Sequence, residues 1–115
     1  MALSDFKTGY LQQSRHADVS GLHRLRRSFA DIRSEMEREL TGLRDRFDKV
    51  AGDAAFSHQL LENEPGRLGL SSKVRRLTGT IIGQSERIAM LQAQIDFVVD
   101  LERRADRFLE GSPLA

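Results

Sequence analysis

The sequence predicts an all-α protein built on a long antiparallel helical hairpin, a two-stranded coiled coil, with a short helix at the N-terminus. Three observations lead to this prediction. Apolar residues recur at helical spacing in both halves of the chain, Pro65-Gly66 stands between the halves, and stretches that would face each other carry opposite charge. Because proline ends helices and glycine tolerates a reversal, the chain should fold back near Arg67.

Capping residues and the midpoint breaker set the element boundaries. A polar joint between residues 14 and 21 precedes the hairpin, where Asp18 or Ser20 is the candidate N-cap. Ser71 or Ser72 is the candidate N-cap of the second long helix. The predicted segments are an N-terminal arm or short helix over 1–17, a hairpin over 18–110 made of helix 18–62, turn 63–71 and helix 72–109, and a frayed tail over 111–115.

Folding about the midpoint places the two apolar stripes opposite each other. The first stripe has two irregular steps, Met36 to Leu40 and Ala54 to His58, where one four-residue step follows another. We expect His58 to lie in the seam, as a core histidine or as a pH-sensitive joint. The predicted seam pairs are Leu25–Leu109, Phe29–Ala105, Ile32–Leu101, Met36–Val98, Leu43–Leu91, Phe47–Ile88, Ala54–Ile81, His58–Leu77 and Leu61–Val74.

Charge and side-chain size support this pairing. Residues 34–65 carry four basic and eight acidic groups, and would lie against residues 66–90, which carry five basic groups and one acidic group. Opposite charges of this kind set the orientation of paired helices. Small residues of the first helix around Gly52 fall opposite Gly79 and Gly83, so we expect the two backbones to approach closely there.

Composition bounds the class of protein. The 115 residues are 30% charged and 6% aromatic, as is typical of one domain of long, surface-rich helices. A net charge of +1 provides no overall field for nucleic acid or anionic lipid. The chain lacks cysteine, and its longest uncharged stretch, 77–85, is too short to cross a bilayer. With no signal region at the N-terminus, we expect a cytoplasmic, bacterial protein.

The helices carry more apolar surface than one seam covers, which indicates a partner. We expect either a homodimer or higher oligomer, with two hairpins forming a four-helix bundle, or a second helical protein lying in a groove. A three-helix monomer with scattered exposed apolar side chains is the alternative. The predicted partner-binding residues are Ile82, Met90, Phe97, Val99, Phe56 and Leu60.

Catalytic chemistry has little support in the sequence. No two of His16, His23 and His58 stand at metal-ligand spacing, and no Glu-x-x-His motif occurs. The glycine pairs lack the strand and the Lys-Ser/Thr of a phosphate-binding loop. We therefore predict a non-enzymatic protein with no catalytic, cofactor or metal site. Its function would be that of an adaptor, scaffold or small chaperone.

One short motif gives an alternative function. The run from Leu22 to Ile32 resembles the phosphoacceptor box of one class of histidine kinases, in which an exposed histidine begins a dimerising helical hairpin. The resemblance implies a histidine phosphotransfer hairpin with His23 as the phosphoacceptor, flanked by Arg24 and Arg26. Arg27 stands where that box carries asparagine.

Two basic clusters give a further alternative, a nucleic-acid-binding accessory protein. One lies around Arg26 and the other between Arg67 and Arg76. Each faces acidic residues across the hairpin and lacks an aromatic residue for base stacking, a pattern that favours a salt-bridged helix face.

Overall fold

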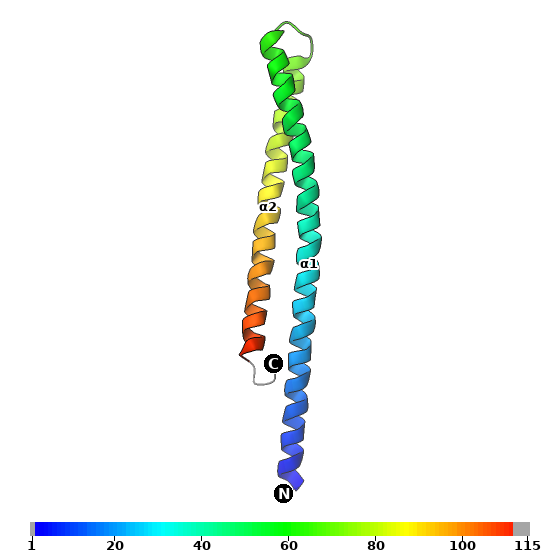
Figure 1. Ribbon diagram of the computed structural model, residues 1–115, viewed down its shortest axis with the longest axis vertical. Coiled ribbons are helices and arrows are strands. Elements are labelled where there is room, and N and C mark those ends of the chain that lie inside the picture. The colour runs from blue at the N-terminus through cyan, green and yellow to red at the C-terminus, as the bar shows by residue number, and fades with distance from the viewer. Residues whose placement is uncertain (1, 112–115) are drawn as a thin grey trace. The chain divides into compact units, whose positions relative to one another are not determined.

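The computed structural model describes the backbone of residues 2–111 and the side chains of residues 11–111. It contains two helices, α1 (Ala2–Asn63) and α2 (Leu70–Glu110), and no strand occurs between residues 2 and 111 (Figure 1). The two helices pack as a hairpin, so the predicted all-α hairpin is confirmed. The predicted frayed tail lies outside the described residues except for Gly111, whose N–H bonds to the Arg107 carbonyl at 3.1 Å.

Helix α1 ends where the sequence requires it to end. Pro65 has no N–H to donate and disfavours a helical residue before it, and α1 stops at Asn63. The Glu64 N–H still donates to the Leu60 carbonyl at 2.7 Å, which completes the last turn.

Helix α2 begins two residues earlier than predicted. Gly69 has a φ of +77°, a left-handed conformation in which glycine alone is unstrained. Its carbonyl accepts the Lys73 N–H at 3.0 Å, and Leu70, the first helical residue, is buried. Ser71 and Ser72 are therefore exposed residues inside the first turn and not N-caps.

The predicted break near the N-terminus is absent. Helix α1 runs continuously through residues 14–21, so the separate short helix is not observed, and Asp18 and Ser20 lie within the helix. No proline occurs before Pro65, and glycine within a helix costs only about 1 kcal/mol relative to alanine. Such small unfavourable terms do not interrupt a long helix.

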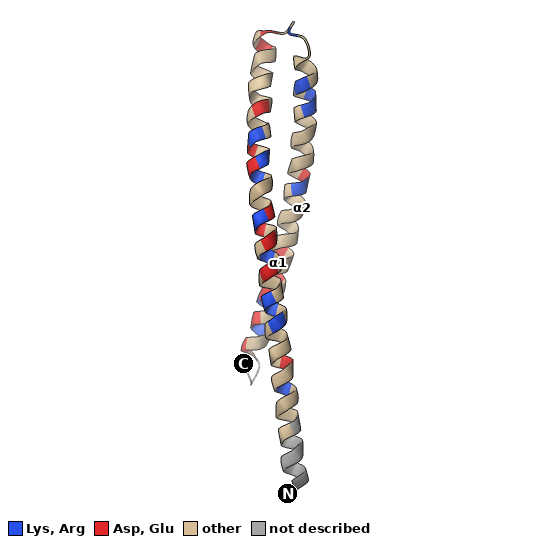
Figure 2. Cartoon of the chain, turned by 90° about the vertical axis from the view of Figure 1, so that its right-hand side faces the viewer, with Lys and Arg blue, Asp and Glu red and all other residues tan. Residues whose placement is uncertain are grey.

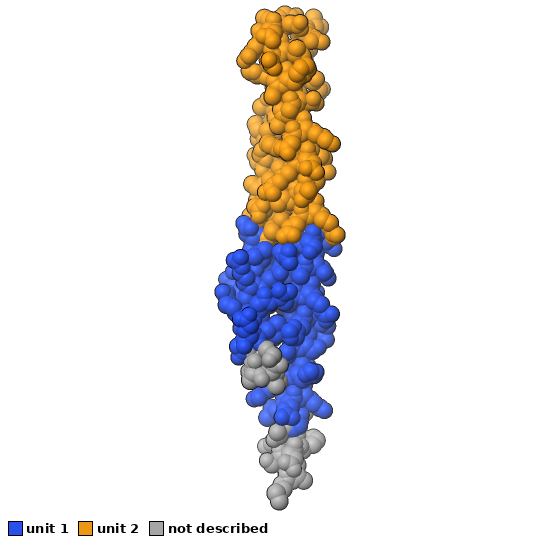
Figure 3. Space-filling view, viewed as in Figure 1, with its two compact units in different colours: residues 1–35, 96–115 blue, residues 36–95 orange. Residues whose placement is uncertain are grey.

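The chain divides into two compact units, each containing part of both helices (Figure 3). Unit 1 comprises residues 1–35 and 96–115, and unit 2 comprises residues 36–95 with the turn.

The seam of unit 2 follows an uninterrupted heptad spacing. Ser57 is buried, with 1% of its surface exposed, whereas the His58 side chain is 60% exposed. The predicted core position of His58 is therefore wrong, and the irregular step from Ala54 is absent. The seam residues, all buried or half-buried, are Met36, Leu40, Leu43, Phe47, Val50, Ala54, Ser57 and Leu61 on α1 and Leu70, Val74, Leu77, Ile81, Gln84, Ile88, Leu91 and Ile95 on α2.

The seam of unit 1 is partly polar. Leu25 and Ile32, both predicted seam residues, are 47% and 41% exposed, while Arg26 and Arg33 take the half-buried positions beside them. On α2 Glu102 is buried, whereas its neighbour Leu101, the predicted seam residue, is half-buried. The heptad spacing that passes through Met36 leads to Arg33 and not to Ile32. Arg33 therefore takes the seam position, where Glu102 lies opposite it. The unit 1 seam residues are Val19, Leu22, Arg26, Phe29 and Arg33 on α1 and Val98, Glu102, Ala105 and Leu109 on α2.

The glycines of unit 2 do not bring the backbones together. A Cβ atom added at Gly52, Gly79 or Gly83 would meet no heavy atom within 4 Å. All three residues are exposed, so the predicted close approach is wrong and these positions face away from the seam.

Candidate interaction surfaces

Two charged pairs hold the helices together in unit 1. Arg33 Nε donates to Glu102 Oε1 at 2.6 Å, and Glu102 is only 7% exposed. Arg26 binds both carboxylate oxygens of Asp106, through Nε and through Nη2 at 3.2 Å. Hydrogen bonds from Arg26 lower the pKa of Asp106 below its ordinary 3.8, and the same contact raises the pKa of Arg26. The two-pronged contact of Arg26 with Asp106 and the contact of Arg33 with Glu102 fix the pairing of the two helices.

In unit 2 the contacts between charged and polar side chains are exposed. Arg87 Nη2 donates to Glu39 Oε1 at 2.6 Å, and Arg44 Nη2 donates to Gln92 Oε1 at 3.2 Å. Figure 2 shows basic residues near the start of α2. Exposed pairs add little stability, so we assign these contacts to helix orientation.

The six predicted partner-binding residues do not form one surface. Four of them are more than half exposed and two, Val99 and Leu60, are half-buried. Phe97 and Val99 belong to unit 1, and at about 100° per residue they point roughly 200° apart around α2. The exposed fractions are 55% for Ile82, 57% for Met90, 64% for Phe97 and 61% for Phe56.

Ile82 and Met90 lie on a second stripe of α2, on the side away from the seam of unit 2. Every residue of this stripe is exposed, and only Glu86 is charged, in a chain that is 30% charged. The spacing is that of one helix face. We name it the α2 outer face, and it consists of Gly79, Ile82, Gly83, Glu86, Ala89, Met90 and Ala93. Sequence reasoning found its two large apolar residues but placed its glycines in the seam.

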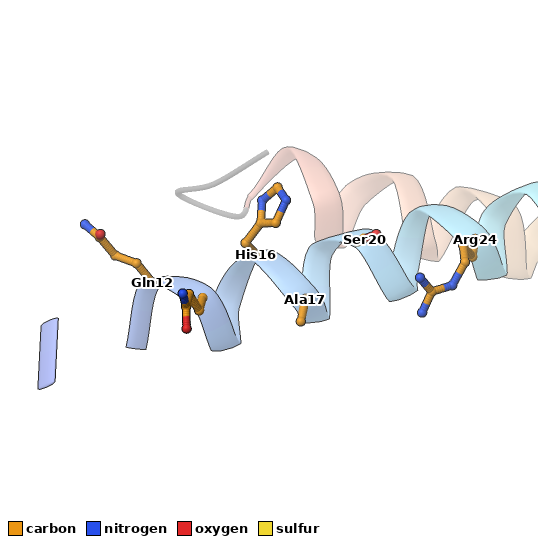
Figure 4. A pocket seen from close by; sticks show the side chains of 6 residues that line it. Gln12, His16, Ala17, Ser20 and Arg24 are labelled. Atoms are coloured by element: carbon orange, nitrogen blue, oxygen red, sulfur yellow. The ribbon is translucent and has the colours of Figure 1, made fainter. Parts of the chain in front are cut away.

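The surface hollows do not resemble a substrate site. One hollow is lined by α1 residues alone, among them Gln12, His16 and Arg24, and Figure 4 shows His16 and Arg24 pointing in different directions. Another, in unit 2, lies over Phe47 and Ile88 at the edge of the seam. Neither gathers the convergent polar groups that fix a small ligand.

The histidines stand apart from one another. His16 and His23 are exposed in unit 1, and His58 Nδ1 in unit 2 lies 3.3 Å from Glu62 Oε1. His23 has the exposure that a phosphoacceptor needs, but Arg26, one of its two expected basic neighbours, is bound to Asp106. Among the described residues, no three His, Cys, Asp or Glu side chains are placed to hold a metal ion.

Two polar atoms in the seam of unit 2 lack hydrogen-bond partners within the described part of the chain. They are Ser57 Oγ and Gln84 Oε1. Gln84 is a polar residue at a seam position of α2. Ser57 was missed, although an unbroken alternation of three- and four-residue steps from Leu43 leads to it.

No helix in the described range is long and apolar enough to cross a membrane. Comparison with models of protein families, with curated proteins and with solved structures finds no match for this chain. The structure thus defines an all-α helical hairpin, and its function has to be argued from its surfaces.

Proposed function

We propose that this protein is a non-enzymatic interaction protein, an adaptor, scaffold or small chaperone that binds a partner helix along the α2 outer face. The supporting observation is the exposure of Ile82 and Met90, at 55% and 57%, on a face with a single charged residue. Contiguous apolar surface of this kind marks interaction sites, and a helix recognises another through residues at this spacing.

The partner helix would supply apolar side chains that cover Ile82 and Met90. Burying the exposed half of each side chain contributes roughly 1 kcal/mol. Gly79 and Gly83 leave open space between them on the same face, so a partner side chain can sit close to the α2 backbone. Binding of this type needs neither a cofactor nor a rearrangement of the seam.

Photo-crosslinking tests the proposal. A photoreactive phenylalanine analogue replaces Met90 in one variant and Gln59, an exposed residue of α1, in a control variant. Illumination in cells should give discrete protein adducts from position 90 and few from position 59. Equal yields at both positions, or none at either, would contradict the proposal.

A second variant separates binding from folding. Met90→Asp adds a charge to the face at a side chain that makes little contact with the seam, so the helix content should stay unchanged. With the crosslinker placed at Ile82, this substitution should remove the adducts. If the adducts persisted, the partner would bind elsewhere.

A further inference from the structure

Unit 1 carries a row of apolar side chains directly beside its seam. Leu25, Ile32 and Phe108 are 47%, 41% and 66% exposed, and Leu101 is half-buried. We name these four residues the unit 1 flank. One hollow of unit 1 is lined by Leu25 of α1 together with Phe108 of α2. Because Ile32 stands seven residues from Leu25 and Leu101 stands seven from Phe108, the flank runs along one side of the helix pair.

The flank completes a second seam that is apolar throughout. Each flank residue immediately precedes a residue of the observed seam, which we call the charged seam: Arg26, Arg33, Glu102 and Leu109. The remaining members of the second seam belong to both. This second seam, which we call the apolar seam, consists of Leu22, Leu25, Phe29 and Ile32 on α1 and Val98, Leu101, Ala105 and Phe108 on α2. Its steps alternate between three and four residues, as a helix seam requires.

We propose that unit 1 is a conformational device with two packing positions, in which α1 and α2 turn about their own axes between the charged seam and the apolar seam. A heptad spreads seven residues over two turns, so the two seams lie about 50° apart around each helix. Since the flank lies on the same side of both helices, they turn in opposite senses, like meshed gears. Leu22, Phe29, Val98 and Ala105 stay between the helices in both positions. This inference goes beyond the proposed function, because it concerns unit 1 and not the α2 outer face.

The two ion pairs hold the charged seam in place. Arg33 Nε donates to Glu102 Oε1 at 2.6 Å, and Arg26 binds both oxygens of Asp106. Removing one partner of a buried ion pair leaves a charge between the helices without compensation. The apolar seam avoids that cost, because the turn moves Arg26, Arg33 and Glu102 to the edge of the helix pair, where long charged side chains reach water. Loss of a carboxylate therefore favours the apolar seam.

The equivalent positions of unit 2 do not offer an apolar seam. Continued at seven-residue steps, the flank meets polar or charged residues in all but one case. Arg87 donates to Glu39 across this side at 2.6 Å, so a turn in unit 2 would bring charged groups between the helices. The device is therefore confined to unit 1. The equivalent residues are Glu39, Arg46, Asp53 and Leu60 on α1 and Lys73, Thr80, Arg87 and Gln94 on α2.

Two pairs of spin labels distinguish a turn from a separation of the helices. Ser28 and Arg104 are exposed on the flank side, Arg27 and Arg103 are exposed on the other side, and none belongs to either seam. A turn should bring labels on Ser28→Cys and Arg104→Cys closer by about 10 Å and move labels on Arg27→Cys and Arg103→Cys apart by about 5 Å. Separation would lengthen both distances. The native chain has no cysteine, so the labels attach only where they are placed.

Glu102→Lys should cause the turn. In the charged seam the new lysine faces Arg33, whereas in the apolar seam both cations reach water. Electron paramagnetic resonance should show the first label distance shortened and the second lengthened, and circular dichroism should show unchanged helix content. The matched control is the double variant Arg33→Glu with Glu102→Arg, which reverses the ion pair and should keep the native distances.

Ile32→Asp tests whether the flank is needed. Alone it should leave the distances unchanged, because Ile32 is 41% exposed in the charged seam. Combined with Glu102→Lys it disables both seams, and both distances should lengthen. If Glu102→Lys alone left the distances unchanged, lengthened both or reduced the helix content, the apolar seam would not form and the proposal would be overturned. All these substitutions lie in unit 1, so that outcome would leave the proposed function of the α2 outer face standing.

Discussion

Replacing Ser57 by alanine should stabilise the hairpin. Ser57 is 1% exposed, and its Oγ has no hydrogen-bond partner among the described residues. The folded protein therefore holds a hydroxyl away from water without compensation, whereas the unfolded chain hydrates it. Alanine removes the hydroxyl and keeps the Cβ atom that packs in the seam.

The expected gain follows from three contributions. A buried polar group without a partner costs about 1–3 kcal/mol. Alanine is also the better helix former, by about 0.5 kcal/mol. Loss of the packing around Oγ opposes both, by less than about 1 kcal/mol. The net effect of Ser57→Ala should be about 1–3 kcal/mol of added stability.

Urea denaturation followed by circular dichroism measures this effect, at one protein concentration because self-association would shift the midpoint. Ser85→Ala is the matched control, since Ser85 is an exposed residue in the interior of α2 and should gain only the helix-propensity contribution. His58→Ala should change little, because the His58 side chain is 60% exposed. If Ser57→Ala were no more stable than Ser85→Ala, the assignment of Ser57 to the seam would be refuted.

Three further predictions concern the packing and the ion pairs between the two helices. Leu91→Ala, at a residue 1% exposed, should cost about 2–5 kcal/mol in a denaturation experiment, whereas Leu25→Ala, at a residue 47% exposed, should cost about 1 kcal/mol. Glu102→Leu alone should destabilise the protein by about 1–3 kcal/mol, because Arg33 loses its carboxylate, and adding Arg33→Met should restore stability to within about 1 kcal/mol of the native chain. The pKa of Asp106 is lowered in the folded state, so its ion pair stabilises the protein above pH 3.8, and this stabilisation is lost as the pH falls through the lowered pKa. Urea denaturation across pH should therefore show that the native chain is more stable than Asp106→Asn near neutral pH. This difference in stability should disappear on acidification.

The hairpin was predictable because its strongest signals are local. Pro65 and the glycines after it mark the turn, and the apolar spacing on either side predicts two helices that need each other. The break predicted near Gly21 was wrong for a physical reason. Glycine and serine lower helix propensity by small amounts, whereas only proline removes a backbone hydrogen bond and clashes with the preceding turn.

The phase of the seam was harder to read. Choosing the most apolar residue at each step selected Leu25 and Ile32, although the spacing that leads to Met36 and Leu40 requires Arg26 and Arg33. An arginine in a seam is stable only when a carboxylate lies across from it, and the sequence of one helix does not show its partner. The same preference for large side chains placed His58 in the seam and missed Ser57.

The composition of the two seams predicts that they differ in local stability. Unit 2 holds four buried apolar residues, Leu40, Leu70, Leu91 and Ile95, whereas the described part of unit 1 holds two, Val98 and Leu109, and its seam includes the charged layer of Arg33 and Glu102. Apolar burial stabilises a helix pair directly, whereas the cost of removing Glu102 from water offsets much of its attraction to Arg33. The neighbouring pair of Arg26 and Asp106 is more exposed and is weakened by salt.

Hydrogen exchange measures this difference along α2. Amides near Leu91 should exchange more slowly than amides near Glu102, because the backbone opens more readily where fewer apolar contacts hold it. Salt should accelerate exchange near Glu102 and leave exchange near Leu91 unchanged. The double variant Arg33→Met with Glu102→Leu supplies the control, since an apolar layer should raise protection in unit 1. Equal protection of the amides near Leu91 and near Glu102 in the native chain would mean that the charged layer stabilises the helix pair as much as leucine does. The lower local stability assigned to unit 1 would then be wrong.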